Sequence, residues 1–192
     1  MKKIILSVLA ACGVMSAQAT VFQYSVTLDG PTEPSPSLGT GTGTVNYDDV
    51  AHTLQMQVSF TGLTNAGSGT TASHIHAATA LPFTGTAGVA TQPTLVGFPI
   101  GVTSGSFSNT LDLTSASSWN GSYITANGGT PASAESALAA AMASGRSYWN
   151  IHSGQFGGGE IRGFLVAVPE PSTLALIALG TGALFWRLRR KR

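Results

Sequence analysis

Apolar and polar residues alternate along two long stretches of this chain. The apolar positions are Phe22, Tyr24, Val26 and Leu28 in the first stretch, and Leu54, Met56, Val58 and Phe60 in the second. Successive side chains of a β-strand point to opposite faces, so a period of two predicts strands that bury one face. The central part of the chain is therefore expected to be all-β.

Shorter strand patterns cover residues 44–47, 73–77, 104–113, 148–153 and 160–166, with a hairpin turn at Asp48 and Asp49 before 53–60. Segment 78–101 contains three prolines and is predicted to be irregular. One helix is predicted, with Thr130 as N-cap, Pro131 in its first turn and Gly145 closing it. Short antiparallel strands with one short helical insertion predict an antiparallel β-sandwich with the helix across its end.

The N-terminal residues predict a secretory signal peptide over residues 1–19. Lys2 and Lys3 precede an apolar run, and Ala17-Gln18-Ala19 is a small-x-small cleavage site. The alternative is lipoprotein processing at Cys12, the only cysteine, which follows Leu9-Ala10-Ala11. Because that cysteine lies in the leader, the predicted domain at 20–167 has neither a disulfide nor a thiolate metal ligand.

The C-terminal segment 168–192 has three parts: Pro169-Glu170-Pro171, an uncharged run from Ser172 to Trp186, and a basic tail. The uncharged run predicts a single transmembrane helix of roughly 22 Å, short for a bilayer unless flanking arginines snorkel. The basic tail is expected to stay cytoplasmic, which places the domain outside.

This three-part arrangement resembles the PEP-CTERM sorting signal of bacterial exported proteins. The resemblance implies that an exosortase cuts near Pro169-Glu170-Pro171 and passes the protein to the cell surface or the exopolysaccharide matrix. The membrane helix would then belong to a transient inner-membrane intermediate. A permanent single-pass anchor, as in a cell-surface adhesin, is the alternative.

Charge separates the domain from the two ends of the chain. Residues 20–168 contain seven acidic and two basic residues, a net charge of −5, and no lysine. Nucleic-acid binding requires a basic patch that neutralises phosphates. The composition therefore excludes nucleic acid as a partner of the domain.

Two patches resemble the CHRD domain, named from chordin. The first is "SHIHAA", with His74 and His76; the second is "YWNIHSGQFGGGEIRGFL". The motif positions in the second patch are Tyr148, Asn150, His152, Gly159, Glu160, Arg162 and Gly163. The resemblance covers roughly residues 22–166, and one departure is that glycines replace the proline often found in the family's turn. It implies an immunoglobulin-like fold related to copper–zinc superoxide dismutases, in an extracellular binding protein whose chemistry the family leaves undefined.

The three histidines of these patches are candidate metal ligands. His74 and His76 share one face of a strand, and His152 shares a face with Tyr148 and Asn150. If the two strands are neighbours, three imidazoles converge and offer a copper or zinc site with an open position. The alternative is that they bond buried backbone groups, Glu160 or Asn150.

No histidine lies between Ala77 and Ile151, so the zinc half of a dismutase site is absent. The sequence also contains none of the common nucleophile, phosphate-loop or zinc-protease motifs. Arg162 is expected to pair with Glu160 or Asp112 and to fix the ends of the strands. His52, at a hairpin end, is expected on the surface.

Two functions follow as hypotheses. The first is a non-enzymatic binding or structural protein, sorted to the envelope or matrix, where an exopolysaccharide or a surface protein would be its partner. The second is a copper-binding redox protein that uses His74, His76 and His152.

Overall fold

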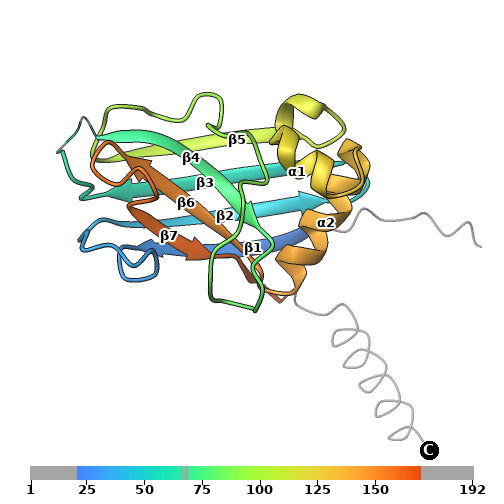
Figure 1. Ribbon diagram of the computed structural model, residues 1–192, viewed down its shortest axis with the longest axis horizontal. Coiled ribbons are helices and arrows are strands. Elements are labelled where there is room, and N and C mark those ends of the chain that lie inside the picture. Colours follow the sequence, from blue (N-terminus) through green and yellow to red (C-terminus); the bar gives the residue numbers. More distant parts are fainter. Residues whose placement is uncertain (1–20, 66, 68, 170–192) are drawn as a thin grey trace, which may run out of the picture.

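The computed structural model describes residues 21–65, 67 and 69–169, which form a curled antiparallel sheet with helices at one end (Figure 1). Its strands are β1 (Val21–Asp29), β2 (Thr40–Asp48), β3 (Thr53–Thr61), β4 (Thr70–Ala77), β5 (Gly105–Asp112), β6 (Ser147–Ser153), β7 (Ile161–Phe164) and β8 (Val166–Ala167). The helices are the short 3₁₀ helix η1 (Ala116–Ser118), α1 (Gly121–Ala126) and α2 (Pro131–Ala143).

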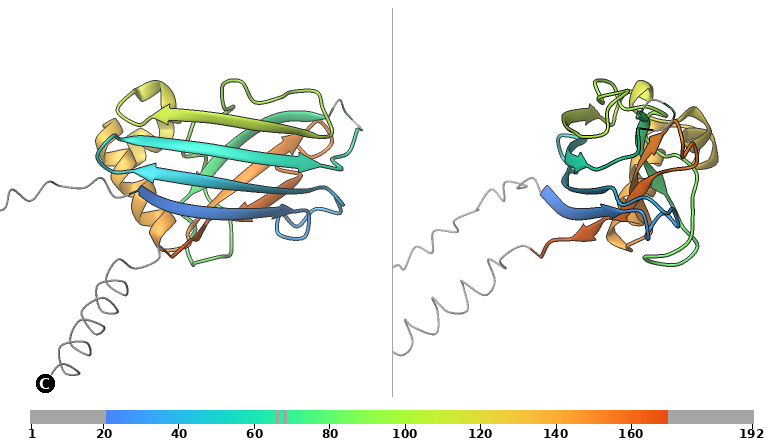
Figure 2. Two further views of the ribbon diagram at one scale, coloured as in Figure 1. Left: turned by 180° about the vertical axis from the view of Figure 1, so that it is seen from behind. Right: turned by 90° about the vertical axis from the view of Figure 1, so that its left-hand side faces the viewer.

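The strands are ordered β4-β6-β7-β1-β2-β3-β5, with β8 paired to β1. The sheet folds over between β7 and β1, so β4, β6 and β7 lie behind the layer made by β1, β2, β3 and β5 (Figure 2). The predicted all-β antiparallel sandwich is confirmed, as two layers of one hydrogen-bonded sheet.

The core fills the space between these layers. Alternate residues of β1 and β3 are buried as their pattern predicts, including Val26, Leu28 and Met56. From the other layer, β6 contributes Trp149 and Ile151, which have no exposed surface. Phe22 is the exception: it is 42% exposed and its ring stacks on Tyr47 at 5.9 Å. The period of two therefore predicted correctly to which face each side chain points, but the N-terminal end of β1 extends beyond the core.

The helix prediction is confirmed. Thr130 accepts a hydrogen bond from the backbone N–H of Ser133, whose side chain bonds back to Thr130, and Gly145 has a left-handed φ of 67° just after the helix. The helix lies across one end of the sheet (Figure 1). The sequence interpretation missed α1, because its residues Tyr123-Ile124-Thr125 favour a strand by propensity. The Asn120 side chain caps α1 and was the available signal.

Segment 78–101 forms no strand of the sheet but follows the outer edge of β4. Its backbone bonds that edge repeatedly: Ala90 N–H donates to Ile75 C=O, Leu95 N–H donates to Ser73 C=O, and Ala77 N–H donates to Gly88 C=O. The Thr91 hydroxyl also accepts the Ile75 N–H at 3.0 Å. The predicted irregular segment is therefore ordered by the edge that it covers.

The predicted signal peptide, Glu170, Pro171 and the apolar run 172–186 lie outside the described residues. Within the described ranges, no helix has the length and apolar character needed to cross a bilayer. Pro169 is exposed where the described chain ends.

Candidate metal centre

Strands β4 and β6 bring the three candidate histidines to one face of the sheet. They pair antiparallel, with His74 opposite Asn150, His76 opposite Tyr148 and Ala72 opposite His152. His74 and His152 are therefore diagonal neighbours, close enough for long side chains to meet. All three histidines are at least 92% buried.

The three imidazole rings converge, and His74 and His152 face each other through their Nε2 atoms. The Nε2 atoms of His74 and His152 are 2.9 Å apart, and the ring of His76 lies 4.6 Å from that of His74. One ring nitrogen from each of the three histidines lies within 4.8 Å of the other two. This is the spacing of a ligand set rather than of unrelated core residues.

The opposite nitrogen of each ring is held by a backbone carbonyl. Nδ1 of His74 bonds Pro93 O at 2.6 Å, Nδ1 of His76 bonds Ala87 O at 2.8 Å, and Nδ1 of His152 bonds Gly157 O at 2.9 Å. A carbonyl oxygen can only accept, so each Nδ1 carries the proton and each Nε2 presents a lone pair.

These lone pairs have no adequate protein partner. His76 Nε2 is buried without a hydrogen-bond partner among the described residues. Burial, with the neighbouring imidazoles adding to it, lowers the pKa of His74 to about 3. Burial is also the main cause that lowers the pKa of His76 to about 4 and lowers that of His152. Neutral rings in this tautomer leave two lone pairs facing each other at 2.9 Å, an arrangement that a shared proton or a metal cation would stabilise.

An aromatic and cationic stack borders the histidines. The ring of Tyr148 lies parallel to His76 at 4.6 Å, and the Arg162 guanidinium lies 4.8 Å from the centre of the Tyr148 ring. Arg162 Nε donates to Thr32 O at 2.6 Å and lies 3.4 Å from Glu33 Oε2.

The expectation that Arg162 pairs with Glu160 or Asp112 is wrong. Its carboxylate partner is Glu33, from the turn-rich segment between β1 and β2, which folds over β7. The Glu160 carboxylate instead accepts from the Ser37 hydroxyl and the Thr64 N–H, both at 2.7 Å. Asp112 accepts from Thr114 beyond β5. The spacing of residues within one segment does not indicate which loop will fold over a strand, so it could not identify the partner of Arg162.

Asn150 and the glycine-rich turn complete the motif. Asn150 Nδ2 donates to Gly158 O at 3.4 Å. A Cβ on Gly159 would lie 2.5 Å from Asn150 Nδ2 and 2.6 Å from Glu33 Cδ, and its φ of 136° also favours glycine. These residues pack the turn against β6, and the histidine side chains bond neither Asn150 nor Glu160.

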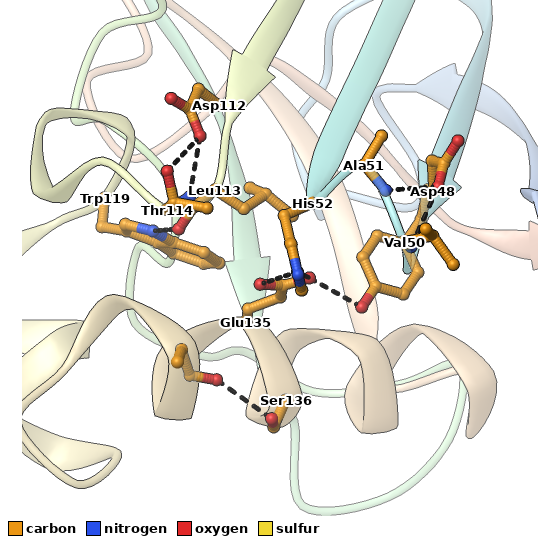
Figure 3. Close-up of polar contacts among 12 residues, drawn as sticks. Asp48, Val50, Ala51, His52, Asp112, Leu113, Thr114, Trp119, Glu135 and Ser136 are labelled. Atoms are coloured by element: carbon orange, nitrogen blue, oxygen red, sulfur yellow. Dashed lines mark hydrogen bonds and ion pairs between the residues drawn. The ribbon is translucent and has the colours of Figure 1, made fainter. Parts of the chain in front are cut away.

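A second polar cluster, missed by the sequence interpretation, joins α2 to the β2–β3 hairpin (Figure 3). The buried Glu135 carboxylate accepts from the Tyr47 hydroxyl at 2.9 Å and contacts His52 Nδ1 at 3.0 Å. His52 is half-exposed, as its hairpin position predicted. At the hairpin itself, Asp48 accepts the backbone N–H groups of Val50 and Ala51, which confirms a turn role.

This second cluster predicts a pH effect on stability. The hydrogen bond and charge of Glu135 raise the pKa of His52, and Asp48 and Asp49 act in the same direction. The contribution is fully present below the unfolded pKa, about 6.5, and is lost as pH rises through the folded pKa. Urea unfolding at pH 6 and pH 9 should show this loss in the native protein. The loss should be smaller in His52→Ala; an unchanged pH dependence there would contradict this role.

Comparison with known families agrees with the motifs. The CHRD domain matches residues 24–165, and the PEP-CTERM protein-sorting motif matches residues 167–191. No curated protein and no solved structure matched the chain. The sorting motif indicates export, recognition by exosortase-type machinery and delivery to the bacterial surface or beyond. Since the first match covers about three quarters of its length, the chain belongs to the CHRD domain family.

Proposed function

We propose that this protein is an exported copper-binding protein whose metal ligands are the Nε2 atoms of His74, His76 and His152. The supporting observation is that all three Nδ1 atoms donate to backbone carbonyls, which leaves the Nε2 atoms of three converging rings free to bind a metal. Bonding to the backbone and binding a metal are therefore compatible roles for these histidines, because each ring has two nitrogens and uses only one for the backbone.

The spacing suits a single first-row metal ion. Metal–imidazole bonds are about 2.0 Å long, so two ligand nitrogens on one ion lie at most about 4 Å apart. The 2.9 Å between His74 and His152 falls inside that limit. The outer limit of 4.8 Å for the set calls for an inward movement of under about 1 Å. His76 Nε2 is buried without a hydrogen-bond partner, so it is the atom that we expect to move toward the other two ligand nitrogens.

The ligand chemistry favours copper. Three neutral imidazoles suit copper or zinc, and copper binds nitrogen sites more tightly in the divalent series. The carbonyl bonds to Nδ1 fix the tautomer and orientation of each ring, as outer-shell partners do in metal sites. Bound copper supplies one-electron chemistry, which makes a redox role the alternative to a purely binding or structural one.

The proposal also includes the place to which the protein is delivered. The sorting motif would carry the site, by way of an inner-membrane intermediate, to the cell surface or the exopolysaccharide matrix. The curled sheet, with histidines at neighbouring strands, supports a superoxide-dismutase-like relationship of the fold. A matrix polysaccharide or surface protein is the expected neighbour there.

A copper and zinc titration of the full-length protein by calorimetry tests the site. One equivalent of copper is expected to bind, and His74→Ala or His152→Ala should weaken that binding at least about 100-fold. His52→Ala is the matched control, because His52 is the one histidine outside the cluster and should leave the affinity unchanged. Electron paramagnetic resonance of the Cu(II) form should show imidazole nitrogen coupling.

Absence of stoichiometric binding in the native protein would overturn the proposal. So would native affinity in His74→Ala, provided that its circular dichroism shows a folded sheet. Tighter zinc than copper binding would keep the site but reassign the metal and remove the redox alternative.

A further inference from the structure

A protruding loop exposes large apolar side chains close to the end of β7, a few residues before the described chain ends. Residues 80–86 are all exposed, and within them Leu81 is 64% and Phe83 is 56% exposed, on either side of Pro82. No charged residue occurs between Ala77 and Asp112. Exposed apolar groups clustered in this way mark a contact surface more often than scattered single residues do.

The loop is held firmly at its base. Leu81 and Thr84 form a β-bridge, Thr79 N–H donates to Arg146 O at 2.9 Å, and Phe83 N–H donates to Gly145 O at 2.8 Å. The Phe83 ring lies so close to Gly145 that an added Cβ would be 2.4 Å from it. Leu81 and Phe83 are therefore displayed at a fixed place, not on a freely moving segment.

That place is beside the end of β7, and both it and the departing C-terminal segment lie toward one end of the sandwich. The Phe83 ring lies 6.1 Å from Phe164 at the end of β7, and β8 follows at once. Val166 and Val168 are 49% and 37% exposed there. The loop and the end of the described chain both lie toward the bottom of the molecule in Figure 1, and the right-hand view of Figure 2 separates them in depth, with the chain end on the side of β1.

The connection to the apolar run is very short. Only Glu170 and Pro171 stand between Pro169 and Ser172, where the uncharged run to Trp186 begins. At about 3.5 Å per residue, three extended residues span about 10 Å. If the run enters a membrane, this edge of the domain is held at the headgroups.

We propose that the loop at Leu81–Phe83 inserts into the interfacial region of the lipid bilayer while the protein is tethered by its sorting segment. The inference goes beyond copper binding and rests on the apolar run of the sorting motif entering the membrane. Leucine and phenylalanine bury apolar area favourably at such an interface. Two contacts, the tether and the loop, would fix the domain's orientation and hold Pro169-Glu170-Pro171 close to the membrane for the sorting enzyme.

An environment-sensitive fluorophore on a single cysteine tests the contact. The full-length chain carries Cys12→Ser with Phe83→Cys, and is reconstituted into vesicles of phosphatidylcholine and phosphatidylglycerol. The label is expected to shift to the blue and to become at least about threefold less accessible to an aqueous quencher. Leu38→Cys is the matched control: Leu38 is 92% exposed, lies at the other end of β1 and should show neither change.

The possible outcomes distinguish insertion of the loop from membrane anchoring by the sorting segment. Chains that float with the vesicles but keep a water-exposed label at position 83 overturn the loop contact and leave the anchor standing. Chains that do not float contradict both. Protection that appears without lipid and grows with protein concentration assigns the loop to a second copy and also overturns the proposal. The copper titration is independent of all these results.

Discussion

Arg162→Met is expected to lower the free energy of unfolding by about 3–5 kcal/mol at pH 8, the usual cost of breaking one side of a buried ion pair. The Arg162 and Glu33 side chains are 7% and 12% exposed. The substitution removes the contact to Glu33, the hydrogen bond to Thr32 O and the contact with the Tyr148 ring. Equilibrium unfolding in urea measures the loss.

The same variant should lose less stability at low pH. Burial raises the pKa of Glu33, and the charge of Arg162 opposes that shift. Without Arg162 the folded pKa rises further, so the penalty of the unpaired carboxylate is absent below the unfolded pKa, grows between the unfolded and the folded pKa, and is complete above the folded one. Unfolding of the variant at pH 4.5 and pH 8 checks this sign.

A double-mutant cycle with Glu33→Gln is the control for Arg162. The double variant should regain part of the stability lost in Arg162→Met, because no buried carboxylate is left unpaired. If the single and double variants are equally destabilised, the effect of Arg162 comes from packing against Tyr148 and not from the ion pair.

Gly163→Ala is expected to cost about 3 kcal/mol or more, at the upper end for overpacked sites. A Cβ at this position would lie 2.0 Å from Thr27 O and 2.7 Å from Thr27 C, both backbone atoms of β1. The sheet folds over where β7 meets β1, and that turn requires the two backbones to approach closely. Thermal and urea unfolding should both report the loss.

Gly157→Ala is the matched control for Gly163→Ala. It lies in the glycine-rich turn of the same motif, and a Cβ there would meet nothing within 4 Å. Its effect should stay within about 0.5 kcal/mol, as for open surface sites. Equal losses at both positions would show that the motif responds to any added side chain and not to the approach of β1.

The sequence was sufficient for what depends on strand period. The sharing of one face by His74 and His76, and by Asn150 and His152, follows from alternation alone, and so does most of the core. Which nitrogen of each imidazole is free depends on the carbonyls of Pro93, Ala87 and Gly157. Every residue carries a carbonyl, so no residue type marks those three.

Contacts between residues far apart in the sequence were the second feature that the sequence could not predict. Glu33 reaches Arg162 across 129 positions of the chain, and Glu135 reaches His52 across 83. Glu33 lies in a turn-rich segment and Glu135 lies in a helix, and no local pattern marks either carboxylate as buried. Their burial depends on how one element packs over another, which local patterns do not specify.

The irregular segment along β4 has a consequence for life outside the cell. An uncovered edge strand is a template on which further chains can add, and it seeds fibrils. Here the N–H and C=O groups of Ile75, the C=O of Ser73 and the N–H of Ala77 are already bonded to residues 88–95. A protein exported to the bacterial surface is beyond the reach of cytoplasmic chaperones. The segment along β4 therefore protects this edge against the addition of strands from other molecules.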